Sequence, residues 1–278
     1  MKKINRRSFL TAAGLTAAAL ALTACGGSAS STASSTASSA ASSEAASTSA
    51  AAELTTVEAG KLTMATNAAF PPYEMTTDAG EFEGIDIDTA KAIAEKLGLE
   101  LQIDDMDFDA ALLSVQQGKA DIVMAGVTVT DERKAVMDFS DSYATGIQSI
   151  IVPEGSDITS PDDLAGKKIG TQRGTTGYIY CSDDFGDDAV VAYDDGLTAV
   201  QALNNGQVDA VVIDNAPAKE FVAANPGLGI LDTSYAEEDY AIGLAKGSAL
   251  EDAVNAALEE LKAAGTLQSI VDKYITAE

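Results

Sequence analysis

The sequence contains no histidine, only two cysteines and few positive charges. The lack of histidine excludes His-based catalytic triads, His-ligated metals and imidazole acid–base chemistry. If Cys25 is modified, as argued below, Cys181 is the one remaining thiol and no disulfide can form within the chain. The 278 residues carry 43 Asp and Glu against 17 Lys and Arg, a net charge of −26. A chain this acidic excludes nucleic acid as a partner.

The N-terminus has the features of an export signal. The apolar stretch 10–24 follows four positive charges, at Lys2, Lys3, Arg6 and Arg7. This stretch is too short for a membrane span. The Arg6-Arg7 pair is compatible with both the twin-arginine and the general secretion routes, and both remain open. Removal of the signal would change the net charge from −26 to −30.

Cys25 follows Leu22-Thr23-Ala24, which resembles a lipoprotein processing site, so we expect Cys25 to be lipidated. Residues 26–52 are almost entirely Ser, Ala, Thr and Gly. Such a composition cannot bury enough apolar surface to offset the entropy cost of ordering. We therefore predict a signal peptide at 1–24, a lipidated cysteine with a disordered tether at 25–53, and a folded part from residue 54 onward.

The folded part alternates strands with helices, which predicts an α/β fold built on parallel sheets. Strands are expected at 61–66, 99–103, 122–125, 168–172 and 208–213. Helices are expected to end at Gly98, Gly118 and Gly206, with Asp109 capping the second, and two amphipathic helices at 250–261 and 267–274 end the chain.

Two strand-like segments, 142–151 and 237–244, connect the halves of the folded part. Because the chain passes twice between the two halves, we predict two α/β lobes joined by a two-stranded hinge. We place one lobe at 54–142 plus 241–278, the other at 147–236, and the hinge at about 143–146 and 237–240. Ligands of open α/β sheets bind in a crevice beyond the strand ends, so each lobe is expected to supply half of a site.

A short internal repeat points to this site. Residues 118–123, Gly-Lys-Ala-Asp-Ile-Val, are echoed 88 positions later by Gly-Gln-Val-Asp-Ala-Val at 206–211. The same offset places Asp214 where Gly126 stands in the first copy. The first copy continues with Thr128 and Arg133, a hydroxyl and a guanidinium that can hold a carboxylate through parallel hydrogen bonds. One strand end therefore offers a cation and the other an anion, as a small zwitterion requires.

The motifs at 65–74, 84–88, 106–109, 118–140 and 166–177, in this order and spacing, resemble those of the bacterial extracellular solute-binding proteins, family 3. This is the polar amino-acid branch of ABC importer receptors. The resemblance implies a type II periplasmic-binding-protein fold that captures a free L-amino acid between two lobes. It also implies an ABC permease and ATPase complex as partners, a monomer, a lipid anchor on the extracytoplasmic face of the cell membrane, and neither metal nor cofactor.

The resemblance also implies which residues would bind the α-carboxylate and α-ammonium groups of the amino acid. Arg133 would clamp the α-carboxylate, with help from the Thr128 hydroxyl and the Thr176 amide at a helix N-terminus. Asp214 would receive the α-ammonium from the second lobe. The backbone of Ala125 and Gly126 would supply a carbonyl and an amide.

The ligand side chain would lie between Phe70 and Phe108. Asn67 and Gln172 stand where relatives place charged or apolar residues. Because both are neutral amides, they favour a polar, uncharged ligand side chain over an unpaired buried cation.

Two other functions remain open from the sequence. Dehydratases acting on cyclohexadienyl amino acids resemble this fold, and Glu74 or Asp214 could serve them as a general acid. A sensory amino-acid-binding module would use the same pocket. We favour the transport receptor, without catalysis, because the complete set of head-group residues is present.

Overall fold

The computed structural model describes residues 54–275. The predicted signal peptide, the lipidated Cys25 and the tether lie outside the described residues. None of the helices between residues 54 and 275 has the length and apolar character that crossing a bilayer requires.

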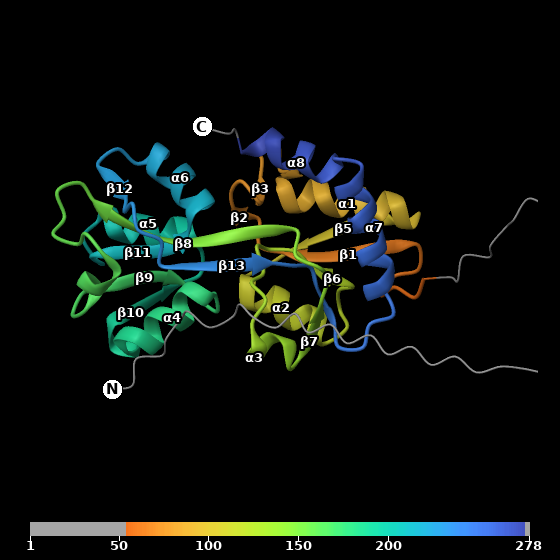
Figure 1. The fold of residues 1–278 in the computed structure, drawn as a ribbon, viewed down its shortest axis with the longest axis horizontal. Coiled ribbons are helices and arrows are strands. Elements are labelled where there is room, and N and C mark those ends of the chain that lie inside the picture. Colours follow the sequence, from red (N-terminus) through yellow and green to blue (C-terminus); the bar gives the residue numbers. More distant parts are fainter. Residues whose placement is uncertain (1–53, 276–278) are drawn as a thin grey trace, which may run out of the picture. The chain divides into compact units, whose positions relative to one another are not determined.

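Lobe 1 is built on a five-stranded mixed sheet with the order β5-β1-β6-β14-β7 (Figure 1). Its strands are β1 (Lys61–Thr66), β5 (Glu100–Asp105), β6 (Ile122–Val123), β7 (Met137–Phe139) and β14 (Gly243–Ala245). Its helices are α1 (Ile85–Leu97), α2 (Phe108–Gln116), α3 (Asp131–Lys134), α7 (Glu251–Ala263) and α8 (Thr266–Tyr274). Strand β1 lies between β5 and β6 and is parallel to both, and five of its six residues are buried, as expected for a strand covered on both faces.

The core of lobe 1 lies on both faces of this sheet. Helices α1, α7 and α8 bury one apolar cluster, which includes Leu62, Ile93 and Leu258. Helix α2 covers a second cluster, which includes Val115 and Val123. The three-layer arrangement follows from the helical spacing of these apolar side chains.

Lobe 2 repeats the plan on a sheet with the order β10-β9-β11-β8-β12, in which β13 also pairs with β8. Its strands are β8 (Ala144–Pro153), β9 (Ile169–Gln172), β10 (Val190–Tyr193), β11 (Ala210–Asp214), β12 (Leu228–Ile230) and β13 (Ala236–Tyr240). Its helices are α4 (Thr176–Phe185), α5 (Gly196–Asn204) and α6 (Asn215–Ala224), with short 3₁₀ helices η1 (Pro161–Leu164) and η2 (Asp187–Ala189). Separate apolar clusters lie on its two faces.

Strands β8 and β13 carry the chain between the lobes. They pair antiparallel from Ala236↔Gln148 to Tyr240↔Ala144 and run side by side in Figure 1. Beyond this pairing, β8 enters the second sheet beside β11, and β13 leads into β14 of the first sheet. The two predicted connectors are therefore one antiparallel ribbon.

The internal repeat extends further than the sequence motif. Helix α2 (Phe108–Gln116) and helix α5 (Gly196–Asn204) have bounds exactly one repeat of 88 residues apart. The strands that follow them, β6 and β11, begin at Ile122 and Ala210, the same distance apart. Both lobes therefore begin a buried strand at the same position relative to a preceding helix, although β11 continues to Asp214 whereas β6 ends at Val123.

Two local predictions need correction. Helix α2 begins at Phe108 with Asp107 at its N-cap, whereas Asp109 is an exposed residue of the first turn. The strand predicted at 122–125 ends at Val123, because Ala125 and Gly126 already belong to the turn that lines the pocket described below.

Within the paired strands β8 and β13, the backbone of Gly146 lies directly against the Tyr240 side chain. A Cβ atom there would overlap the buried ring of Tyr240 on the paired strand β13. We expect Gly146→Ala to lower the free energy of unfolding by about 1–3 kcal/mol, the usual cost of overpacking. Urea unfolding measures this loss. Gly229→Ala on β12 is the matched control, because no atom lies within 4 Å of its Cβ position. An equal effect of the two substitutions would contradict the role of the Tyr240 contact.

Candidate functional site

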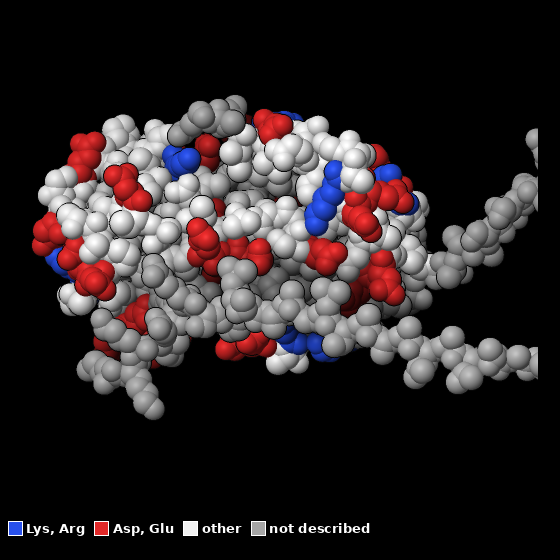
Figure 2. All heavy atoms as spheres, in the orientation of Figure 1, with Lys and Arg blue, Asp and Glu red and all other residues white. Residues whose placement is uncertain are grey.

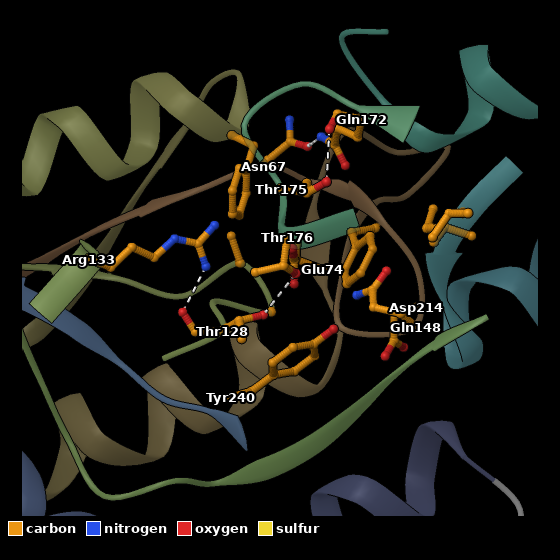
Figure 3. Close-up of a pocket in the computed structure, with 16 residues that line it drawn as sticks. Asn67, Glu74, Thr128, Arg133, Gln148, Gln172, Thr175, Thr176, Asp214 and Tyr240 are labelled. Carbon is orange, nitrogen blue, oxygen red and sulfur yellow. Dashed lines mark hydrogen bonds between the residues drawn. The ribbon is translucent and has the colours of Figure 1, made fainter. Parts of the chain in front are cut away.

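One pocket lies where the two lobes meet, and the space between its lining atoms amounts to about 440 Å³. All ten residues predicted to bind ligand line it: Asn67, Phe70, Phe108, Ala125, Gly126, Thr128, Arg133, Gln172, Thr176 and Asp214. The other lining residues are Glu74, Gln148, Thr175, Val212, Ile213 and Tyr240. Figure 3 shows the labelled polar side chains converging from both lobes.

Arg133 enters the pocket from the short helix α3, whose N-cap is Thr130. Its side chain is buried and donates to the carbonyl of Thr128 at 2.7 Å and, across the lobes, to the carbonyl of Gly174 at 3.2 Å. The guanidinium carbon lies 5.4 Å from the centre of the Phe108 ring. Burial lowers the pKa of Arg133, while the charge of Glu238 acts in the opposite direction. These contacts use two of the five guanidinium donors, so donors remain for an anion.

Thr128 and Thr176 approach each other from opposite lobes. Their hydroxyl oxygens lie 3.4 Å apart. The Thr128 hydroxyl also donates to Glu238 on β13 at 3.0 Å, and Gln148 on β8 donates to the same carboxylate oxygen at 3.0 Å. Thr176 is the first residue of α4, where free backbone N–H groups and the helix dipole favour anions.

Asp214 ends strand β11 and caps helix α6, accepting from the amide of Ala216 at 2.9 Å. Its other oxygen accepts from the amide of Ile147 on β8 at 2.8 Å. Burial raises the pKa of Asp214 to about 6, although these amide hydrogen bonds favour the charged form. Asp214 is therefore the structural cap and also a pocket carboxylate.

Asn67 and Gln172, predicted as neutral contacts for the ligand side chain, are bonded to each other. The Gln172 amide donates to Asn67 across the lobes at 2.8 Å, and Asn67 donates to the Met106 carbonyl at 2.9 Å. The two bonded side chains form one part of the pocket wall. Because they bond to each other, fewer of their amide donors and acceptors are available to a ligand.

Glu74 is one of the pocket residues outside the predicted binding set, since it entered the sequence analysis only as a candidate acid of the enzyme alternative. It begins strand β3 (Glu74–Thr76) of the small sheet β2-β3-β4, with β2 at Ala69–Phe70 and β4 at Phe82–Glu83. Its side chain is fully buried, and neither carboxyl oxygen has a hydrogen-bond partner among the described residues. Burial, and then the negative charge of Asp86, raise the pKa of Glu74 well above its ordinary value.

Gln148 and Tyr240 are two further pocket residues that the sequence did not single out. Both lie on the inter-lobe ribbon. A polar Gln within the apolar run of β8 was a signal for one of them. Tyr240 gave no such signal, because an aromatic residue in a strand is usually core.

Residues 62–277 match the model of a family described as bacterial extracellular solute-binding proteins, family 3. The chain belongs to this family. It is 33% identical over 283 residues to a probable histidine-binding protein of Neisseria gonorrhoeae, an alignment that covers 99% of this chain and 98% of that protein. The L-cystine-binding protein TcyJ of Escherichia coli (strain K12) is 32% identical over 226 residues, 80% of this chain and 85% of that protein. The structure of an ancestral arginine-binding protein bound to arginine has a TM-score of 0.74 and 43% identity, covering 78% of this chain and 98% of that one.

These matches confirm the predicted family and the predicted type II α/β fold. The family 3 relatives are named as binding proteins, and the chain is a solute-binding protein, not a dehydratase. The roles of the individual pocket residues remain predictions.

The raised pKa of Glu74 has a consequence for stability. A carboxyl whose folded pKa lies above its unfolded value binds more protons when folded, so its contribution to stability is lost as pH rises through that interval. We expect Glu74→Gln to gain stability relative to wild type between pH 5 and pH 8, by at most about 1.4 kcal/mol per pH unit. Urea unfolding at several pH values measures this. Glu81→Gln, an exposed carboxyl on the same small sheet's loop, is the control and should show no such trend.

Proposed function

We propose that this protein captures a free L-amino acid with a cationic side chain in the inter-lobe pocket and delivers it to the permease of an ABC importer. The observation that carries this proposal is the opposition of two buried charged groups, Arg133 from lobe 1 and Asp214 from lobe 2, in one pocket. A free amino acid carries the complementary pair, a carboxylate and an ammonium, on one carbon.

The α-carboxylate binds Arg133 and the N-terminus of α4 at Thr176. The guanidinium keeps unused donors, and the helix dipole adds to the attraction. The α-ammonium binds Asp214, whose pKa of about 6 leaves it ionised at neutral pH. A buried charge-assisted hydrogen bond of this kind contributes about 1.5–3 kcal/mol.

The side chain of the ligand lies between Phe70 and Phe108 and ends near Glu74. The Glu74 carboxyl, which has no hydrogen-bond donor in the described part of the chain, supports a cationic ligand side chain. The bond between Asn67 and Gln172 weakens the case for a neutral amide side chain. The names of the relatives, which include histidine and arginine binders, agree with a cationic ligand, whereas cystine and glutamine are neutral alternatives that other relatives are named for.

Ligand binding shifts the lobes toward the closed arrangement. We assign one body to 54–142 plus 241–278, the other to 147–236, and the hinge to about 143–146 and 237–240, where β8 and β13 pair. Contacts between the lobes, such as Asn67 with Gln172 and Arg133 with Gly174, form only when they meet. A ligand that contacts both lobes favours this state by the contacts it makes only there.

The protein acts on the extracytoplasmic face of the cell membrane, held by a lipid on Cys25 and the tether that follows it. The acidic surface seen in Figure 2 keeps the folded part soluble near the membrane. The permease and ATPase complex receives the closed, loaded monomer.

Arg133→Ala tests the head-group site. We expect it to weaken binding of L-arginine, L-histidine or L-cystine, whichever binds wild type, by at least about 2 kcal/mol, roughly 30-fold. Isothermal titration calorimetry measures this, and circular dichroism checks the fold. Arg173→Ala is the matched control, because Arg173 is an exposed arginine beside the pocket residue Gln172. Wild-type affinity in Arg133→Ala would refute the clamp.

Cys25→Ser tests the anchor separately. We expect the variant to leave the membrane fraction, while its affinity for the same amino acid is unchanged because the pocket lies in the folded part. Cell fractionation with immunoblotting measures the location. Cys181→Ser serves as control and should stay with the membrane, since Cys181 lies inside lobe 2. Retention of Cys25→Ser at the membrane would contradict lipidation.

A further inference from the structure

We propose that Glu74 and Asp86 share one proton in the unliganded protein, and that a cationic ligand side chain displaces this proton to solvent. The inference rests on the proposed function, because it concerns how the same pocket selects its ligand. It adds that amino-acid capture is coupled to proton release, and that this exchange favours cationic over neutral side chains of equal shape.

The backbone forces the two carboxyl residues together. Gly84, with φ of 135°, packs so closely on residues 73 and 74 that a Cβ there would overlap the Tyr73 carbonyl and lie 2.9 Å from the Glu74 Cα. The amide of Asp86 donates to the Tyr73 carbonyl at 2.9 Å. The start of helix α1 is thereby fixed against the start of β3, and a residue other than glycine at 84 would separate them.

Three of the four carboxyl oxygens in this pair lack a donor. Asp86 Oδ2 accepts from the Gly126 amide at 3.0 Å and from the Tyr143 hydroxyl at 2.8 Å. Asp86 Oδ1 and both oxygens of Glu74 are buried without a hydrogen-bond partner among the described residues. Unpaired buried oxygens are costly, and a proton held between the two carboxyls makes one of them a donor to the other.

The charged groups around this pair do not provide a cation that could neutralise a second carboxylate in place of the proton. The ionisable groups that act on Glu74 are acidic and come from three elements: Asp86 of α1, Asp105 of β5 and Asp214 of β11. The phenols that face the acid cluster, Tyr73, Tyr143 and Tyr240, have pKa values raised by burial and stay neutral. Arg133 already bonds to Thr128 and Gly174. Two ionised carboxylates would therefore lie buried without a cation.

A cationic side chain changes this balance. When its N–H groups reach Glu74, the carboxyl O–H bond breaks, the proton passes to water, and the carboxylate accepts from the ligand. The pair goes from one negative charge to two while the ligand adds one positive charge, so the net buried charge is unchanged. A neutral side chain of the same shape brings no positive charge to balance a second carboxylate, so the proton remains on the Glu74–Asp86 pair.

The experiment compares L-arginine with L-citrulline, which has the same length but carries a neutral urea. The full chain is titrated with each at pH 7 in phosphate and in Tris, whose ionisation enthalpies differ. For wild type we expect the arginine enthalpy to depend on the buffer with release of about one proton per site, and the citrulline enthalpy to be independent of it. The affinity ratio of arginine to citrulline should rise by up to about tenfold per pH unit while the proton is held.

Glu74→Gln should abolish the arginine-specific proton release and flatten the pH dependence of the ratio. Asp86→Asn provides a second variant with the same expectation, and Glu81→Gln is the exposed control that should behave as wild type. Protons taken up or lost at Asp214 affect both ligands alike, because both carry the same α-ammonium, and so cancel in the comparison.

The outcomes separate this inference from the proposed function. Arginine binding with a buffer-independent enthalpy, or release that persists in Glu74→Gln, overturns the proton exchange and leaves the amino-acid receptor standing. Tighter binding of citrulline or of L-cystine than of arginine overturns the cation selectivity, both here and in the proposed function, and leaves the amino-acid receptor standing. If none of L-arginine, L-lysine, L-histidine, L-citrulline and L-cystine binds, the receptor proposal itself fails.

Discussion

The guanidinium of Arg133 lies away from water, between a carbonyl of its own lobe and a carbonyl of the other, with the Phe108 ring against it. Burial of a cation is costly unless neighbouring dipoles and charges compensate it. Here carbonyl oxygens and the nearby Glu238 provide part of that compensation, and an incoming carboxylate would provide the rest. The arrangement of the turn 125–128, of the short helix α3 and of the contact between lobes all serve to hold this one charge in place.

The same requirement explains why the site needs two lobes. Each lobe repeats a helix, a glycine and a strand at the same spacing, so each delivers a strand end to the pocket. The two copies differ where it matters chemically: the first continues to Thr128 and Arg133, whereas the second ends on Asp214. A duplicated scaffold thus brings opposite charges, Arg133 and Asp214, to one pocket, and the paired strands β8 and β13 connect the two lobes that carry them.

The sequence predicted much of this because its signals are local. Glycines at helix ends, apolar runs of buried strands and the repeat of 88 residues indicated the α/β plan. The family resemblance named the ten residues that the structure places in one pocket. The prediction that Asp109 caps helix α2 was wrong. Asp107 is the N-cap, and residue type alone does not distinguish between two aspartates two positions apart. The sequence also did not foresee the bond between Asn67 and Gln172, since 105 residues separate them and neither motif refers to the other.

The sequence by itself determined the family and the two-lobed α/β architecture, because these depend on periodicity and on short motifs. The resemblance carried by those motifs also predicted which residues would line the pocket. Only the tertiary structure decided the environment of Glu74. Its carboxyl is buried and accepts no hydrogen bond from a donor among residues 54–275, and the close packing of Gly84 on residues 73 and 74 brings Asp86 beside it. Burial and the proximity of like charges are properties of the packed chain, and they determine a carboxyl's proton affinity where residue type alone does not.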